Sequence, residues 1–494
     1  MLDVPEIRVR VVRDVPVVPD RRYVLYWMIA HRRLTWNHSL QQAVSWCRRL
    51  GLPLVIFEPL RCDYAWASDR LHWFFIQGMQ DQERVLRTSP VVYYPYLEPY
   101  VGASKGLLTA LAQDAAVIVT DDYPCIFVPQ MIQAASGQVG CRLEAVDSNG
   151  VLPLRLAEKT FARAVDFRRF MHRSIGAQLA ESPVAEPLKQ LPALPTSSRK
   201  PTILSPDVLQ RWPAARVEDL QPSDLARFPL DHSVAPVSTV GGSTAGQQRM
   251  SEFLARKLPQ YEAQRRNVDQ VGTSQMSPYL RYGHVSAHEI VTKVLQQSRW
   301  TPDKINLKKI SSNQGFWGLG EAAESFLDEL ITWRELGFNM SSRESNYDQY
   351  ESLPSWARKT LHQHASDPRP ATYELEQFER AETHDEIWNA AQRQLVNDGV
   401  IHNYLRMLWG KKILHWSKSP QAALEILIHL NNKYAIDGRD PNSYSGIFWV
   451  LGRYDRAWGP EREVFGQIRY MTSDSTAKKI NLKQYLRRYS RAAL

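Results

Sequence analysis

The chain has 494 residues, of which 44% are hydrophobic and 23% charged, and these values exclude a wholly disordered, collagen-like or membrane-embedded protein. Its formal net charge is +9, and it holds 15 tryptophans. The basic excess suits a polyanionic partner such as nucleic acid, although a basic housekeeping enzyme would show the same charge. No apolar run approaches the ~20 residues that span a bilayer. The N-terminus has no apolar signal region, so we expect a cytoplasmic protein.

Apolar runs alternate with amphipathic segments over the first quarter of the chain. Runs typical of strands lie at residues 23–30, 53–59, 91–96 and 115–122. Helical spacing marks residues 38–51, 67–88 and 104–114. The alternation predicts a parallel, doubly wound sheet that binds ligands near the carboxyl ends of its strands. No GxGxxG motif follows the first run, which disfavours a nicotinamide dinucleotide fold.

The rest of the chain changes character twice. Prolines recur every few residues from about residue 181 to 236, which indicates a long connection wrapped over the surface. After residue 246 almost every segment has the apolar spacing of three and four that is typical of helices. We therefore predict an N-terminal α/β domain at residues 1–180, an interdomain linker at 181–244 and a larger all-helical domain at 245–494.

The four cysteines give no sign of a metal centre or a disulfide framework. Cys47, Cys62, Cys125 and Cys141 all lie in the first third of the chain, and no two have CxxC spacing. We expect reduced thiols and no metal.

Two polar segments of the helical part are candidates for ligand binding. The first, TSQMSP from Thr273, predicts a helix N-terminus with free N–H groups and hydroxyls that suit a phosphate, unless it is simply a capped helix. The second, DGRD from Asp437, places two carboxylates three residues apart in a polar loop. They would suit a ring N–H or ribose hydroxyls, and a surface turn is the alternative. No histidine stands nearby at metal-ligand spacing.

Four tryptophans of the helical part form a third candidate. Trp409 and Trp416 are seven apart and share one helix face. Trp388 lies on the preceding predicted helix, which a short connection at residues 397–400 folds back antiparallel, and Trp449 follows later. Such residues are most often core, but indoles also relay electrons or stack on bases.

A fourth candidate is DELITWREL, where Glu329 and Trp333 are four apart and share a helix face. The carboxylate would suit an imide-bearing ligand, and an ordinary helix with a polar stripe is the alternative. The tail from residue 452 to 494 holds ten basic and four acidic residues, an excess of six. This charge indicates either a surface for a phosphate backbone or a solvated face.

Taken together, these segments resemble the photolyase/cryptochrome family, and more narrowly the class II cyclobutane pyrimidine dimer photolyases. The resemblance covers most of the chain and is carried by an ordered series of motifs: THDEIWNAAQRQLV, GVIHNYLRMLWGKKILHW, LNNKYAIDGRDPNSYSGIFW, DRAWG and FGQIRYM. It implies an N-terminal α/β domain of antenna type, with a Rossmann-like parallel sheet, and a larger all-helical C-terminal domain that binds FAD in a folded shape.

The resemblance implies cofactor contacts. The FAD phosphates would be held by Tyr261, Thr273, Ser274, Gln275, Met276 and Ser277. Asp437 and Asp440 would bind the ribityl, flavin or adenine portion, with Arg406 paired to Asp437. Asn431 would face the flavin N5 and help to set the protonation and redox state of the flavin.

The resemblance also implies roles toward electrons and substrate. An electron-transfer chain would run from the flavin to the surface through Trp409, Trp388 and Trp416. The dimer would be contacted by Glu329, Trp333 and Trp449, and Asn403 would touch the substrate or the flavin. Two positions depart from the class II pattern. This chain reads ELITWREL where ELVVRREL is common, so Trp333 stands where the pattern has a basic residue. Asn403 follows His402 where the pattern more often has His-Gly.

The implied activity is light-driven repair, in which reduced anionic FAD passes an electron to a flipped-out pyrimidine dimer in DNA. The enzyme would be a carbon–carbon lyase, monomeric and cytoplasmic (nucleoid-associated in a prokaryote). Its antenna site would hold a deazaflavin-type second chromophore or be empty. A cryptochrome-like flavoprotein without repair activity is the alternative within the fold, and the short chain after Arg491 weighs against it. A non-catalytic nucleic-acid-binding module with core tryptophans is the alternative from another class.

Overall fold

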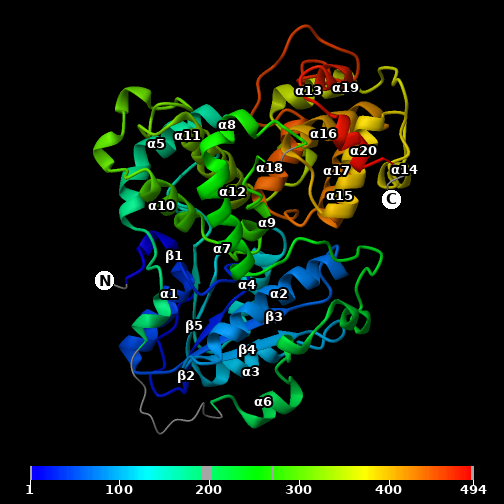
Figure 1. The fold of residues 1–494 in the computed structure, drawn as a ribbon. Helices are drawn as coiled ribbons and strands as arrows, with labels where there is room; N and C mark the ends of the chain where they lie inside the picture. The colour runs from blue at the N-terminus through cyan, green and yellow to red at the C-terminus, as the bar shows by residue number, and fades with distance from the viewer. Residues whose placement is uncertain (1–2, 192–202, 270–271, 491–494) are drawn as a thin grey trace.

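A six-stranded sheet lies at one end of the molecule, and a larger group of helices lies at the other (Figure 1). The structure is a computed structural model that describes residues 3–191, 203–269 and 272–490. Within these residues, no helix is both long enough and apolar enough to cross a bilayer. Arg491 and part of the predicted linker lie outside them.

The sheet has the strand order β1-β6-β5-β2-β3-β4. The four predicted strands are β2 (Tyr23–Trp27), β3 (Leu54–Leu60), β4 (Val92–Leu97) and β5 (Ala115–Asp121), and they pair in parallel. Two strands that the sequence did not indicate complete the sheet: β6 (Arg142–Val146) runs parallel to β5, and β1 (Val9–Arg13) pairs antiparallel with β6. The predicted α/β class is confirmed.

Helices cover both faces of this sheet. All five residues of β2 are buried, as a continuous apolar run in a doubly wound sheet requires. On one face α1 (His38–Leu50) packs Leu40 and Val44 against the sheet. On the other face α3 (Leu107–Asp114) packs Leu107 and Leu111. The side chains of β2 therefore alternate between two separate cores.

The segment between the sheet and the helical part joins both. Helix α5 (Ala164–Ala180) packs Phe167 and Met171 into the core of the helical part. The described linker contains α6 (Pro206–Arg211) and the short turns η3 (Val217–Asp219) and η4 (Pro222–Arg227). The turns bury their apolar side chains against α2 (Asp69–Leu86). The exact domain boundaries at residues 180 and 244 stay predictions.

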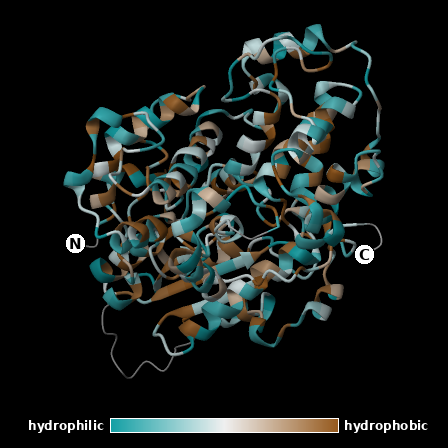
Figure 2. Ribbon diagram, turned by 45° about the horizontal axis from the view of Figure 1, so that its top comes forward, coloured by the Kyte–Doolittle hydropathy of each residue, from teal (hydrophilic) through white to brown (hydrophobic). Residues whose placement is uncertain are grey.

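The helical part is a bundle whose members are mostly short. Its helices are α7 (Ser243–Glu252), α8 (Tyr261–Gln264), α9 (Ser277–Arg281), α10 (Ala287–Gln297), α11 (Glu321–Leu327), α12 (Arg334–Arg343), α13 (Ser355–Gln363), α14 (Leu375–Glu379), α15 (Glu386–Asp398), α16 (Asn403–Trp416), α17 (Pro420–Tyr434), α18 (Pro441–Val450), α19 (Ser473–Ala477) and α20 (Lys483–Arg488). Hydrophobic residues gather in the strands and along the inward faces of these helices (Figure 2).

A buried carboxylate joins the helical part to the sheet. Glu335 on α12 accepts hydrogen bonds from the backbone N–H groups of Val151 (2.7 Å) and Leu152 (2.9 Å), just beyond β6. A Cβ atom on Gly150 would lie 2.6 Å from this carboxyl group, so the close contact requires glycine. Burial raises the pKa of Glu335 to about 7, although the two N–H groups and Arg334 lower it.

Replacing Glu335 with glutamine should remove a pH dependence of stability. The wild-type carboxyl is protonated in the folded protein up to about pH 7, but in the unfolded chain only up to about pH 4.5. As the pH rises through this window, the free energy of unfolding of the wild type should fall by about 3 kcal/mol relative to E335Q. Urea denaturation at about pH 5 and about pH 8 measures this difference, with the same change at the exposed Glu181 as the control. Equal pH dependence in wild type and E335Q would contradict the prediction.

Candidate active site

A cavity of about 1400 Å³ lies among the helices of the C-terminal part. Of the seventeen site residues that the sequence predicted, fifteen line it: Tyr261, Thr273, Ser274, Gln275, Met276, Ser277, Glu329, Trp333, Asn403, Arg406, Trp409, Asn431, Asp437, Asp440 and Trp449. Typical small-molecule sites measure ~300–1000 Å³. The cavity therefore has room for more than one ligand.

The predicted phosphate loop ends at a short helix, as its sequence indicated. Helix α9 begins at Ser277, with Pro278 in its first turn, and the preceding Gln275 has a positive φ of 54°. The side-chain oxygen of Gln275 accepts a hydrogen bond from Arg249 of α7. Arg249 also lines the cavity, and the sequence pattern gave no reason to single it out.

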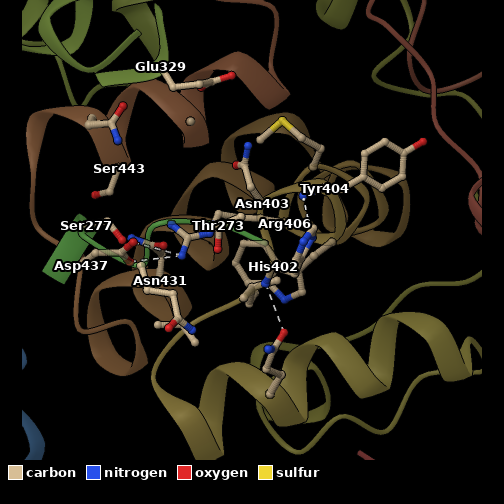
Figure 3. A pocket seen from close by; sticks show the side chains of 18 of the residues that line it. Thr273, Ser277, Glu329, His402, Asn403, Tyr404, Arg406, Asn431, Asp437 and Ser443 are labelled. Carbon is tan, nitrogen blue, oxygen red and sulfur yellow. Dashed lines mark hydrogen bonds and ion pairs between the residues drawn. The ribbon is translucent and has the colours of Figure 1, made fainter. Parts of the chain in front are cut away.

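A loop that doubles back on α17 carries the second polar group. Asp437 pairs with Arg406 of α16, with the Nη2 atom 3.1 Å from Oδ1 and 3.4 Å from Oδ2. Asn431 of α17 is 3% exposed and lines the same wall. A Cβ on Gly438 would lie 2.7 Å from the Asn431 carbonyl oxygen, so glycine permits the return of the chain. Figure 3 shows these side chains directed into one space.

Asp440 has a structural partner on each carboxylate oxygen. It begins α18 as the N-cap residue, and its Oδ1 accepts from the Asn442 N–H at 2.8 Å. Its Oδ2 accepts from the Tyr123 hydroxyl at 2.9 Å. Tyr123 follows β5, so this bond ties the carboxyl end of the sheet to the cavity. The surface-turn alternative for this loop is wrong, because Asp440 is buried.

Glu329 and Trp333 lie on a π-helical turn, η9 (Asp328–Trp333), rather than on the ordinary α-helix that the spacing predicted. Such turns are frequent at functional sites. Both side chains line the cavity. Glu329 pairs with Arg265, whose Nη1 lies 3.0 Å from its Oε1. Desolvation raises the pKa of Glu329, and the Arg265 guanidinium opposes this shift.

Two close helix contacts bring the walls together. A Cβ on Gly337 of α12 would lie 2.6 Å from the Pro441 carbonyl oxygen of α18. A Cβ on Gly410 of α16 would lie 2.5 Å from a methyl group of Val450, at the other end of α18. Helix α18 therefore packs tightly on α12 and on α16, which sets Trp449 into the same cavity as Glu329.

The three tryptophans of the predicted chain adjoin one another. The indole N–H of Trp409 donates to Gln392 at 2.9 Å, and that of Trp388 donates to the Trp409 carbonyl oxygen at 3.0 Å. The Trp388 and Trp416 rings are 6.1 Å apart, centroid to centroid. Trp409 lines the cavity, whereas Trp388 and Trp416 lie behind it.

The expected surface position of Trp416 is wrong. Its exposed fraction is 1%. The rings of Tyr373 and His384 pack on it at centroid distances of 5.7 and 4.9 Å, and they separate it from solvent. The sequence placed Trp416 correctly on the face of Trp409 but carried no signal for these two covering residues.

The sequence also missed several other residues of the cavity wall. Arg281 of α9 is buried and donates to the Gly438 carbonyl oxygen at 3.0 Å, which supports the loop of Asp437. The C-terminal α20 adds Tyr485, whose hydroxyl donates to Gln394 of α15 at 2.8 Å. These positions depend on tertiary contacts that no local pattern reveals.

Only some of the basic residues of the tail lie on the surface. Arg453 is buried and donates to the Tyr347 carbonyl oxygen at 3.0 Å, so this residue cannot belong to an exposed basic face. Arg469, Arg487 and Arg488 are exposed and line the cavity. The other exposed basic residues in the described part of the tail, which ends at residue 490, are Arg456, Arg462, Lys478, Lys479 and Lys483.

Known proteins resemble the chain over nearly its whole length. It is 33% identical over 473 residues to the deoxyribodipyrimidine photo-lyase of Methanothermobacter thermautotrophicus, which covers 95% of each chain. The chain belongs to the deoxyribodipyrimidine photo-lyase family. It is 31% identical to the photo-lyase of Arabidopsis thaliana (94% of this chain, 88% of the relative) and 30% identical to that of Potorous tridactylus (98% and 85%). No protein-family model matches the sequence.

The fold comparison agrees with the photo-lyase assignment. A bacterial class III photolyase from Agrobacterium tumefaciens superposes with a TM-score of 0.65 at 15% identity, over 95% of this chain and 86% of that one. The predicted membership of the photolyase/cryptochrome family is thus confirmed, as is the prediction that the chain is an enzyme of the photo-lyase type. The class II assignment and the individual residue roles stay predictions.

Proposed function

We propose that this enzyme is a class II photolyase that repairs cyclobutane pyrimidine dimers in DNA with light. The observation that carries the proposal is that one cavity gathers two sets of side chains. Arg406, Asn431 and Asp437 suit a flavin, and Glu329 with two indoles suits a flipped-out pyrimidine dimer. Electron transfer from one ligand to the other requires such a shared space.

The side chains of the cavity fit FAD in its reduced, anionic form. The Arg406–Asp437 ion pair and the Asn431 amide offer donors and acceptors to a flavin ring. The loop from Thr273 to Ser277, with Arg249 beside it, offers N–H groups, hydroxyls and a guanidinium to a pyrophosphate. The bound flavin supplies the excited-state electron, while the protein orients it and excludes water.

The opposite wall fits a pyrimidine dimer. Such a lesion is poorly stacked and paired, so it leaves the duplex at a lower free-energy cost than an intact pair. Trp333 and Trp449 offer aromatic surfaces, and Glu329 offers a carboxylate to the polar imide edge. Asn403, at the start of α16, lines the cavity between the two walls and would touch substrate or flavin.

The proposal has further parts that rest on the family resemblance. The exposed basic residues of the tail would meet the DNA backbone with salt-dependent affinity. The chain would act as a monomer in the cytoplasm, on the nucleoid in a prokaryote, with domains at residues 1–180 and 245–494. A deazaflavin-type antenna would occupy the α/β domain.

A light-dependence assay tests the function. The chemically reduced holoprotein is mixed with an oligonucleotide that contains one dimer, and intact bases are quantified after illumination or darkness. Restoration in the light alone supports the proposal. A flavin-bearing protein that leaves the dimer intact in the light would favour the cryptochrome-like alternative, and a colourless protein the non-catalytic binding module.

Replacing Asp437 with alanine should yield protein that is poor in FAD. The change removes a carboxylate that would bind the flavin and leaves the Arg406 guanidinium without its partner in a largely buried position. The affinity for FAD should therefore fall on the order of 100-fold. The flavin-to-protein absorbance ratio measures the effect, with the exposed Asp474→Ala as the control. Full flavin content in D437A would remove Asp437 from the binding site.

Replacing Trp409 with phenylalanine should stop photoreduction of oxidised FAD but spare repair by chemically reduced enzyme. The proposed electron donor would be lost, while the cofactor and the lesion wall would remain. Absorbance under steady illumination follows the reduction, and Trp46→Phe on α1 is a matched control far from the cavity. Equal photoreduction in W409F and wild type would show that electrons take another route.

A further inference from the structure

A buried lysine lies behind the Trp449 wall of the cavity. Lys411 of α16 is 0% exposed, and its Nζ donates to the Val450 carbonyl oxygen at 2.6 Å. The same Nζ lies 4.9 Å from the centroid of the Trp449 ring. Trp449 belongs to the cavity wall, whereas Lys411 lies on the protein side of it. The amino group therefore contacts both the backbone and the ring at the end of α18.

The close approach of two helices makes this contact possible. Gly410 allows α16 to meet α18 at Val450, and the next residue, Lys411, reaches the last turn of α18. The carbonyl groups of a helix's last turn lack partners within the helix and favour a cation. An amino group at this place holds the backbone carbonyl of Val450, the residue that follows Trp449.

Burial and two nearby charges set the protonation state of the Lys411 amino group. Burial lowers the pKa of Lys411 to about 7, Asp455 raises it and Arg469 lowers it further. Among the described residues, Lys411 has no carboxylate within ion-pair distance. Arg469 lines the cavity with its guanidinium 5.6 Å from the Trp449 ring, so two cations approach the same indole. Contact with an indole face stabilises a desolvated ammonium group.

We propose that Lys411 is a positioning residue for the lesion wall. It ties the Val450 carbonyl and the Trp449 ring together, so that the indole keeps one orientation toward the cavity. This role rests on the proposed function, in which Trp449 packs on the dimer. It concerns substrate binding and leaves the flavin and its electron donors untouched.

A double-mutant cycle tests the role. K411M, W449F and the double variant are loaded with reduced FAD and compared in dimer-oligonucleotide affinity and in light-driven turnover. K411M should bind the dimer about tenfold more weakly, with a raised KM, an unchanged kcat and full flavin content. The double variant should bind no more weakly than W449F, because Lys411 acts through Trp449. K411R should restore part of the affinity, and K418M, at an exposed lysine, should match the wild type.

A second measurement needs no DNA and remains decisive if K411M does not fold. Lysines labelled with 13C at Cε are observed by NMR in the holoprotein, and the Lys411 signal is the one that K411R removes. It should carry a ring-current shift that is smaller in W449F, where a phenyl ring replaces the indole, and it should titrate near pH 7. A Lys411 signal that W449F leaves unchanged would overturn the proposal.

The outcomes distinguish the role of Lys411 from the function of the enzyme. Additive losses in K411M and W449F, in an enzyme that repairs dimers, would show that Lys411 only caps α18 and would overturn its role alone. A wild-type holoprotein that repairs no dimer in the light would overturn the proposed function, and the role of Lys411 with it.

Discussion

The packing of α18 against two other helices at once is the constraint on which the cavity depends. Gly337 and Gly410 supply the room for it, since a single methyl group at either position would meet α18 at 2.6 Å or less. Helix α18 carries Asp440 at its start and Trp449 near its end. Helix α12 follows the π turn of Glu329, and α16 carries Arg406 and Trp409. The walls that we assign to flavin and lesion are thus held together by close helix packing at two glycines.

The α/β part supports the packing of α18 and α12 through hydrogen bonds. The Tyr123 hydroxyl, just beyond β5, fixes Asp440, and the backbone beyond β6 fixes Glu335. Both contacts come from the carboxyl edge of the sheet, the edge at which doubly wound folds bind their ligands. In this protein, residues at that edge form hydrogen bonds with the helical part. The sheet therefore supports the proposed active site through its contacts with Asp440 and Glu335, separately from any chromophore of its own.

The local sequence pattern predicted the strands whose residues are mostly apolar. The four strands that were found, β2, β3, β4 and β5, are largely apolar runs. Two strands were missed: β1 reads VRVVR and is half-exposed along its length, and β6 reads RLEAV, with two charged residues in five. The spacing of Glu329 and Trp333 fits an α-helix and a π turn alike, so it predicted their shared face but the wrong helix type.

Fifteen of the seventeen predicted site residues line one cavity. They could be predicted because the family resemblance extends over a long, ordered series of motifs; no single motif was decisive. Arg265, Arg281 and Lys411 escaped notice for a common reason. Each depends on a carboxylate or carbonyl group that is distant in sequence. Only the folded chain brings such partners together.

The contact between Gly150 and Glu335 has a consequence for engineering by domain exchange. No side chain fits at position 150 while the carboxyl group of Glu335 occupies its place beneath the Val151 and Leu152 N–H groups. The two positions belong to different parts of the predicted domain division, so a chimaera that takes its sheet from one relative and its helices from another must transfer them as a pair. At this interface the residues that must be kept together are Gly150 and Glu335, although they lie in different predicted domains.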